Sequence, residues 1–279
     1  MNRIRIFALL AALSAILVLI GRSAFGGQGA LIFFLIALAM NFFSYFYSDK
    51  IVIKMTRSRP LSRNEAPEIY EIVERLSNRA GLTMPRLYLT PSMQPNAFAT
   101  GRNPQHAAVA VTEGLVRLLN KTEIEGVLAH ELAHVKNRDT LVATIAASIA
   151  GAITFIASIA RWGMILGSNR DDDEGNNPLA ALVLLIVAPI AALLIQMAIS
   201  RTGEFNADAT GARMAGNTAG LAGALVKLEQ GAHRIPMDAS PATAHLFIVN
   251  PLSAQNLARL FSTHPSTSER IKRLRQMTL

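Results

Sequence analysis

Two histidines and a glutamate form the pattern H-E-x-x-H at residues 130–134, where His130 and His134 are four residues apart and Glu131 lies between them. On an α-helix, residues four apart share one face, so both imidazoles can bind one metal ion. Glu131 could then take a proton from a zinc-bound water while zinc polarises a carbonyl. The pattern predicts zinc-dependent hydrolysis of a bond such as the peptide bond. Histidines that merely pack or face solvent are the structural alternative.

The residues around this motif favour a helix. Thr122 followed by Glu125 has the spacing of a capping box, which predicts a helix start just before the apolar residues Ile124 and Val127. No proline interrupts the stretch through His134. We therefore expect the helix to begin near Thr122 and to carry the whole motif.

The composition limits the class of protein. The chain has 279 residues, of which 51% are hydrophobic and 16% are charged, and it contains no cysteine. Disulfides and thiolate metal ligands are therefore excluded. The formal net charge of +8 arises without a basic helix or interleaved aromatic and basic residues, so nucleic acid is not an expected partner. Lys and Arg instead gather beside apolar blocks, as in a membrane protein.

Four apolar stretches are candidates to cross the roughly 30 Å hydrocarbon core of a lipid bilayer. They lie at about 6–20, 30–47, 141–160 and 179–200. We predict an N-terminal transmembrane hairpin (1–47), a protease region with the motif helix (48–140), a second transmembrane hairpin (141–200) and a C-terminal helical part (201–279). A cleavable signal peptide is the alternative for the first stretch, and a buried hairpin in a soluble core is the alternative for the last two.

The distribution of positive charge predicts the orientation in the membrane. Basic residues closely follow the second stretch, and Arg201 follows the fourth, whereas the connections within the two hairpins carry few basic residues or are rich in acidic ones. The basic residues after the second stretch are Lys50, Lys54, Arg57, Arg59 and Arg63. Because positive charge favours the cytoplasmic side, both termini and the active site should be cytoplasmic, in a multi-pass protein of the plasma membrane.

The polar region between the hairpins has alternating helix and strand signals. Ser62 and Glu65 have capping-box spacing before an apolar stripe that ends at Gly81. Short strands are expected at 86–90, 96–101 and 107–112, between Pro and Asn turn residues. The sheet could pair an exposed edge with an extended peptide, or it could only brace the motif helix.

Glu204 is the best candidate for a third metal ligand. Catalytic zinc usually has three protein ligands and keeps one position open. Glu204 follows the fourth apolar stretch, as His134 precedes the third, so the second hairpin would bring both to the same membrane face. Asp208, one turn later, could accept a hydrogen bond from the other ring nitrogen of a ligand histidine. An exposed acid at a helix start is the alternative for Glu204.

These motifs together resemble a known family over nearly the whole chain. The sequence resembles the HtpX-type integral-membrane zinc metalloproteases, gluzincins related to the CAAX prenyl proteases. The segments that carry the resemblance are the initial pair of apolar stretches, Pro95-Asn96-Ala97-Phe98-Ala99, His130 to Asp139, Glu204-x-x-x-Asp208 and Ser262-Thr263-His264-Pro265. One departure is Gly203, where many relatives are expected to have a basic residue.

The resemblance implies a fold, a cofactor and site residues. It implies a mainly α membrane protein, with four transmembrane helices and a cytoplasmic zincin-like α+β protease domain containing a small β-sheet. One zinc ion per chain would be bound by His130, His134 and Glu204, with Glu131 as general base. The substrate edge would comprise Asn96, Ala97, Phe98 and Ala99. His264 would stabilise the developing oxyanion, although a structural role in a polar loop is an equal alternative.

The activity implied is that of a zinc metalloendopeptidase in the bacterial inner membrane. Its substrates would be unfolded or misfolded membrane proteins, and some soluble ones, with membrane quality-control proteins as possible partners. One alternative is a site-2-type intramembrane protease, which would bury the motif in the membrane. Another is a zinc-stabilised scaffold or chaperone without enzymatic activity, which would not need Glu131.

Overall fold

The computed structural model describes residues 2–147, 149, 201–237, 239–251 and 265–279. Of the expected third membrane segment, residues 141–147 and 149 are described and helical, while the rest of it and the whole fourth segment lie outside the described residues. His264 also lies outside them. The described part is mostly helical and contains one small mixed sheet, which confirms the mainly α class with a small sheet, while the four transmembrane helices stay a prediction.

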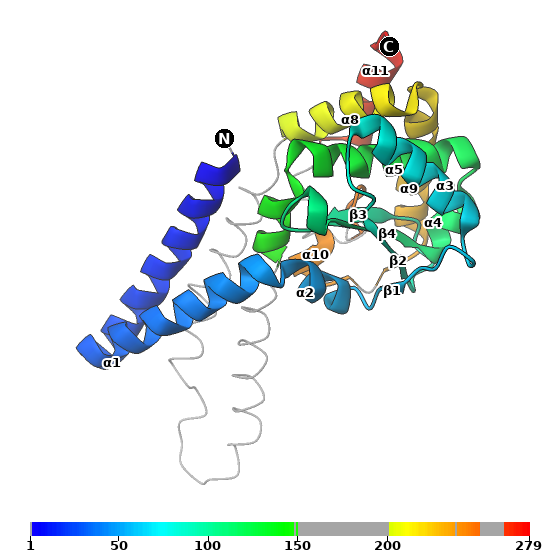
Figure 1. Ribbon diagram of the computed structural model, residues 1–279. Coiled ribbons are helices and arrows are strands. Elements are labelled where there is room, and N and C mark those ends of the chain that lie inside the picture. Colours follow the sequence, from blue (N-terminus) through cyan, green and yellow to red (C-terminus); the bar gives the residue numbers. More distant parts are fainter. Residues whose placement is uncertain (1, 148, 150–200, 238, 252–264) are drawn as a thin grey trace.

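The N-terminal helix α1 (Asn2–Phe46) folds into two arms. The backbone of Gly26 has a positive φ of 65°, and Figure 1 shows the two arms meeting at a sharp bend. The arms are joined across the hairpin by a 2.9 Å hydrogen bond from Asn41 Nδ2 to Ser14 Oγ. Such a bond between two apolar helices suits a hairpin in lipid, where polar side chains need protein partners.

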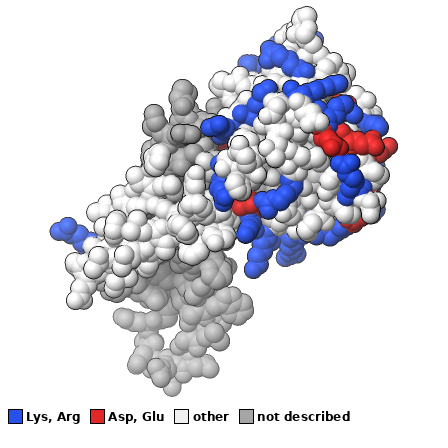
Figure 2. Space-filling model, in the orientation of Figure 1, with Lys and Arg blue, Asp and Glu red and all other residues white. Residues whose placement is uncertain are grey.

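One helical segment of the described residues, Gly26–Phe46, is long and apolar enough to cross a membrane. Its mean hydropathy is 2.0, and only 17% of the apolar window is buried by protein. Figure 2 shows the arms of α1 as largely uncharged surface, whereas Lys and Arg are spread over the adjoining domain. This apolar surface, left uncovered by the rest of the described chain, is what a lipid-facing helix requires.

The sheet has four strands in the order β1-β2-β4-β3. Its strands are β1 (Arg59–Pro60), β2 (Arg86–Thr90), β3 (Ala97–Thr100) and β4 (Ala108–Thr112). The three predicted strands are confirmed, and the short β1 was not predicted. β2 and β4 are parallel, while β3 is antiparallel to β4 and forms an edge of the sheet.

The central helix α5 (Lys121–Asn137) carries the H-E-x-x-H motif through the middle of the protease domain. It packs against α3 (Pro67–Ala80), α8 (Arg201–Ala215), α9 (Ala219–Arg234) and β3. Figure 1 shows α5 enclosed by these helices with the sheet beneath it. The other helices whose bounds lie within the described residues are α2 (Ser48–Met55), η1 (Pro104–His106), α4 (Glu113–Leu118), α10 (Pro241–Ala244) and α11 (Thr267–Gln276). Enclosure on several sides explains why α5 is buried along most of its length.

The two predicted capping boxes form differently from the sequence expectation. The cap of α5 is Asn120, whose side chain accepts from the N–H of Glu123, while Glu123 accepts from Asn120. The prediction that Thr122 is the cap residue was wrong, because the cap lies two residues earlier. Glu125, the expected partner of Thr122, instead pairs with Arg75 at 2.9 Å. Ser62 and Glu65 do bond reciprocally, but in a turn that precedes α3.

Candidate metal centre

His130, His134 and Glu204 meet in one cluster of ligand atoms. The Nε2 atoms of the two histidines are 3.2 Å apart. Glu204 places Oε1 3.4 Å from Nε2 of His134 and Oε2 3.8 Å from Nε2 of His130. Tetrahedral zinc with bonds near 2.0–2.1 Å separates its ligand atoms by roughly 3.3 Å. The donor set and its spacing therefore fit a zinc ion.

Close packing of α8 on α5 brings Glu204 to the histidines. Glu204, Asp208 and Gly211 are spaced by four and three residues, so they share one face of α8. A Cβ atom on Gly211 would lie only 2.8 Å from the backbone nitrogen of His130. The absence of a side chain at Gly211 thus lets the two ligand-bearing helices approach each other.

His130 is held by a buried acid and a buried arginine. Its Nδ1 lies 2.9 Å from Oδ1 of Asp208, which places the proton on Nδ1 and leaves Nε2 free toward a metal. Arg270 of α11 donates to both carboxylate oxygens of Asp208, at 2.9 and 2.7 Å. Nη2 of Arg270 lies 3.3 and 3.4 Å from the two ring nitrogens of His130, so it is not aligned with one of them. Asp208 therefore sets the tautomer.

His134 has an acid partner of its own. Its Nδ1 lies 3.6 Å from Oδ2 of Asp139. Arg138 ends α5 in the left-handed conformation, with a φ of 60°, and the N–H of Asp139 then donates to the carbonyl of His134. This turn at the helix end carries the carboxylate of Asp139 back toward the imidazole. Both histidines thus direct Nε2 toward Glu204 and the other nitrogen toward an aspartate.

Glu131 is buried beside this cluster. Burial raises the pKa of its carboxyl to about 7, and the nearby charge of Glu204 acts in the same direction. The N–H of Ala99 in β3 donates to the carboxylate and opposes the shift. A carboxyl with a pKa near neutrality can both accept and return a proton, as a general base in hydrolysis must.

The two histidines have opposite pKa shifts. Burial, aided by the charge of Arg270, lowers the pKa of His130 to about 4, so its imidazole is neutral at physiological pH. Burial also lowers the pKa of His134, but the charge of Glu204 and the hydrogen bond with Asp139 outweigh it and raise the pKa to about 10. His134 therefore holds a proton where a metal would bind.

The proposed substrate edge lies beside the cluster but is not exposed. Asn96, Ala97 and Phe98 are fully buried, and Ala99 is almost so. Residues 248 and 249 cover the outer side of β3, so the edge is not open as expected, and the assignment of Asn96 to Ala99 as the substrate edge stays a prediction. His264 lies outside the described residues, so its proposed role at the cluster stays a prediction.

The sequence interpretation did not identify Arg270 and Asp139. Arg270 is one of several basic residues in α11, and no local pattern distinguishes the one that is buried. Asp139 had a usable signal, because it is the first acidic residue after His134 and follows the end of the motif helix. A search for aspartates near each ligand histidine would have found it.

Comparisons with known proteins identify the family of the chain. Residues 63–278 match the model of peptidase family M48. The chain is 64% identical, over its full length and that of the relative, to "Protease HtpX homolog" of Pelotomaculum thermopropionicum. It is 53% identical to "Protease HtpX" of Legionella pneumophila, with 99% of each chain covered. The crystal structure of S. mikatae Ste24p matches with a TM-score of 0.49 and 17% identity, over 98% of this chain and 63% of that one.

Proposed function

This chain belongs to peptidase family M48 and is a membrane-anchored metalloendopeptidase, and we propose that its metal is a single zinc ion held by His130, His134 and Glu204. The observation that carries this proposal is the cluster of two imidazole nitrogens and one carboxylate with tetrahedral spacing. Bound zinc supplies a Lewis acid that polarises a peptide carbonyl and makes water more acidic.

The residues around the metal site have different roles in the reaction. Glu131 takes a proton from the attacking water and delivers it to the leaving amine. Asp208 and Asp139 fix the imidazoles of His130 and His134 in the tautomer that a metal needs. His264 is proposed, from the family resemblance alone, to stabilise the developing oxyanion.

We also propose that the site faces the cytoplasm and that four segments span the membrane. In support, α2 follows the membrane segment directly and exposes Lys50 and Lys54, the charge pattern of a cytoplasmic flank. The substrates would be unfolded or misfolded membrane proteins, with some soluble ones. The position of α5, enclosed by the sheet and by α3, α8 and α9, does not favour an intramembrane site-2-type protease.

One preparation tests the zinc requirement, the role of Glu131 as base and the cleavage of peptide bonds. The full chain is purified in detergent, stripped with a chelator, and assayed on casein with and without added zinc. Zinc should restore cleavage, while Glu131→Gln should bind zinc with similar affinity and fail to cleave. Cleavage by Glu131→Gln at the parent rate would disprove the assigned base. Full activity after complete removal of metal would disprove the metal site.

A further inference from the structure

The outer side of β3 is covered by residues 247–249 of the same chain. The N–H of Ile248 donates to the carbonyl of Ala97 at 3.0 Å. The side chain of Asn96 bonds both backbone groups of Val249: its Nδ2 donates to the carbonyl at 2.7 Å, and its Oδ1 accepts from the N–H at 3.3 Å. Backbone hydrogen bonds of this kind are how an extended peptide adds to the edge of a sheet.

This contact lies next to the proposed general base. Directly before β3, the carbonyl of Asn96 accepts from the N–H of Thr112 in β4, so Ala97 and Ala99 direct their backbone groups away from β4. Ala97 holds Ile248, and Ala99 donates to Glu131. The two positions are roughly 7 Å apart along a strand. A peptide bound at this edge with its scissile bond near Glu131 must therefore use the place that Ile248 occupies.

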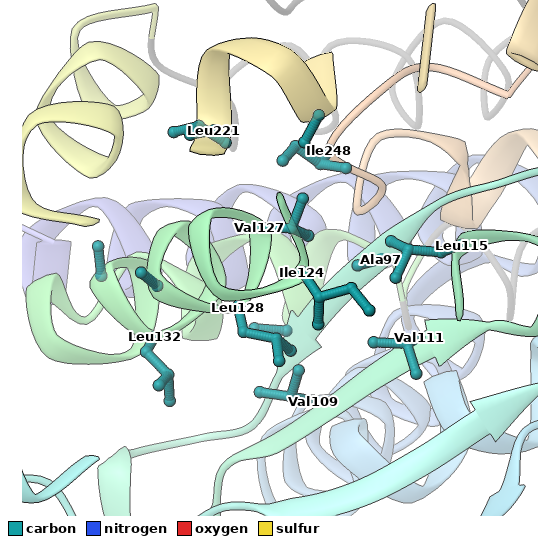
Figure 3. Close-up of a cluster of buried hydrophobic side chains, with 14 of the residues drawn as sticks. Ala97, Val109, Val111, Leu115, Ile124, Val127, Leu128, Leu132, Leu221 and Ile248 are labelled. Carbon is teal, nitrogen blue, oxygen red and sulfur yellow. The ribbon is translucent and has the colours of Figure 1, made fainter. Parts of the chain in front are cut away.

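The side chains of the segment enter two buried clusters, with Leu246 and Phe247 in one and Ile248 and Val249 in the other. Phe247 packs on Phe98, with ring centroids 5.1 Å apart, in one buried cluster. Ile248 enters the main core cluster, which also contains Val127 of α5 and Leu221 of α9 (Figure 3). Val127 precedes His130 by three residues and lies on the same side of α5. Ile248 therefore fills an apolar pocket one helical turn from a proposed zinc ligand.

Arg270 holds the carbonyl of the same residue. Its Nη1 donates to the oxygen of Ile248 at 3.1 Å, while its other nitrogens bind Asp208. The carbonyl of Ile248 is thus bound by the arginine that holds Asp208, its N–H by Ala97 of β3, and its side chain by the core cluster. A substrate residue beside the scissile bond would need the same three contacts.

We propose that residues 247–249 occupy the peptide-binding edge as an internal pseudosubstrate, and that substrates bind after displacing them. This inference rests on the proposed function of the site. It assigns the ligand class as an extended peptide with a large aliphatic side chain in the Ile248 pocket, its carbonyl on Arg270 and its backbone on Ala97 and Asn96. Because the segment must leave first, the apparent affinity for substrate is lowered by the fraction of chains in which the edge is covered.

The test measures binding of a peptide with the sequence of residues 245–250, His-Leu-Phe-Ile-Val-Asn, carrying a fluorescent label. The receptor is the zinc-loaded full chain with Glu131→Gln, which does not cut the probe. Ile248→Ala weakens the internal segment, and Ile69→Ala is the matched control, since both isoleucines are buried in the same core cluster. Ile248→Ala should bind the peptide at least about tenfold more tightly than Ile69→Ala does. Equal binding by the two variants would overturn the proposal.

A second measurement uses the unmutated chain, so it does not depend on how Ile248→Ala folds. The unlabelled peptide should inhibit casein cleavage competitively, and the same peptide with Asp in place of Ile should not. No inhibition at millimolar peptide, or equal inhibition by both peptides, would overturn the pseudosubstrate while leaving the protease activity intact. If the unmutated zinc-loaded chain bound the peptide and cleaved nothing, the proposed function would be overturned instead.

Discussion

Arg270 and Asp208 form a doubly hydrogen-bonded ion pair at 2.9 and 2.7 Å, and both side chains are almost completely buried. Burial alone raises the pKa of Asp208, but the charge of Arg270 outweighs it and lowers that pKa to about 2. Asp208 is thus kept ionised while it accepts the proton of His130. The pair connects α11, near the end of the chain, to the proposed metal ligand on α5.

Arg270→Gln should therefore weaken both the fold and the metal site. Removing one partner of a buried ion pair typically costs about 3–5 kcal/mol of unfolding free energy. Loss of an outer partner of a ligand histidine typically lowers metal affinity by about 10–100-fold. Urea unfolding and a zinc competition titration measure the two effects.

Arg275→Gln is the control for that prediction, because Arg275 lies on the same helix and is exposed. Its unfolding free energy should change by no more than about 0.5 kcal/mol. Equal zinc affinity in Arg270→Gln and Arg275→Gln would show that the buried pair does not position His130.

The sequence predicted the parts of the site that depend on local spacing. The i, i+4 relation places His130 and His134 on one face of any helix, and the residues around them predict a helix. The strand boundaries also followed from local turn residues. Glu204 required a longer argument, through the hairpin expected between the two ligand stretches.

Contacts between distant segments could not be predicted in this way. The covered edge of β3 depends on residues 248 and 249, about 150 positions along the chain from Asn96, and no pattern marks that pairing. The prediction of the N-cap of α5 was wrong for a different reason. Thr122 and Asn120 both have an acidic residue three positions later, and the pairing of Glu125 with Arg75 decides between them.

Zinc binding should release close to one proton per chain at pH 8. The pKa of His134 is raised to about 10, so the metal-free imidazole is protonated there, whereas an ordinary histidine is neutral. A zinc ligand must be deprotonated, so the metal displaces this proton. The measurement is the pH change of a weakly buffered metal-free sample on titration with zinc.

The variant His130→Ala, His134→Ala serves as the blank for non-specific zinc binding in that titration. It should release far less than one proton per zinc at the same pH. Release near zero from the parent chain would contradict the positive shift of the His134 pKa, and would indicate that Glu204 and Asp139 do not stabilise an imidazolium.

Cleavage should lose rate as the pH falls below about 7. Glu131 acts as a base only when ionised, and burial raises its pKa to about 7 in the metal-free chain. The charge of a bound zinc ion acts in the opposite direction, so the acid limb lies at or below that value. The measurement is kcat/KM between pH 5 and 9 at saturating zinc, with circular dichroism at each pH to confirm the fold. A kcat/KM that rises from pH 7 to pH 5 would exclude Glu131 as the base.

Gly211→Ala should disturb the metal centre without changing any ligand. A Cβ at this position would lie 2.8 Å from the backbone nitrogen of His130 and 3.0 Å from the carbonyl oxygen of Ala129. Backbone atoms inside a helix cannot move aside cheaply, so α8 must shift away from α5 and carry Glu204 with it. Overpacking of this kind typically costs about 1–3 kcal/mol, which exceeds the roughly 1 kcal/mol that Ala gains over Gly in a helix.

Gly223→Ala on α9 is the matched control. Its new Cβ would lie 3.2 Å from Oε1 of Glu123, a side-chain contact that needs a shift of only a few tenths of an ångström. Gly223→Ala should leave zinc affinity unchanged, whereas Gly211→Ala should lower it by about tenfold or more, the size of effect seen when a ligand is misplaced. Thermal unfolding and zinc competition are measured on both variants. Equal zinc affinity would show that the spacing of α5 and α8 tolerates a methyl group, and that close helix packing does not set the position of Glu204.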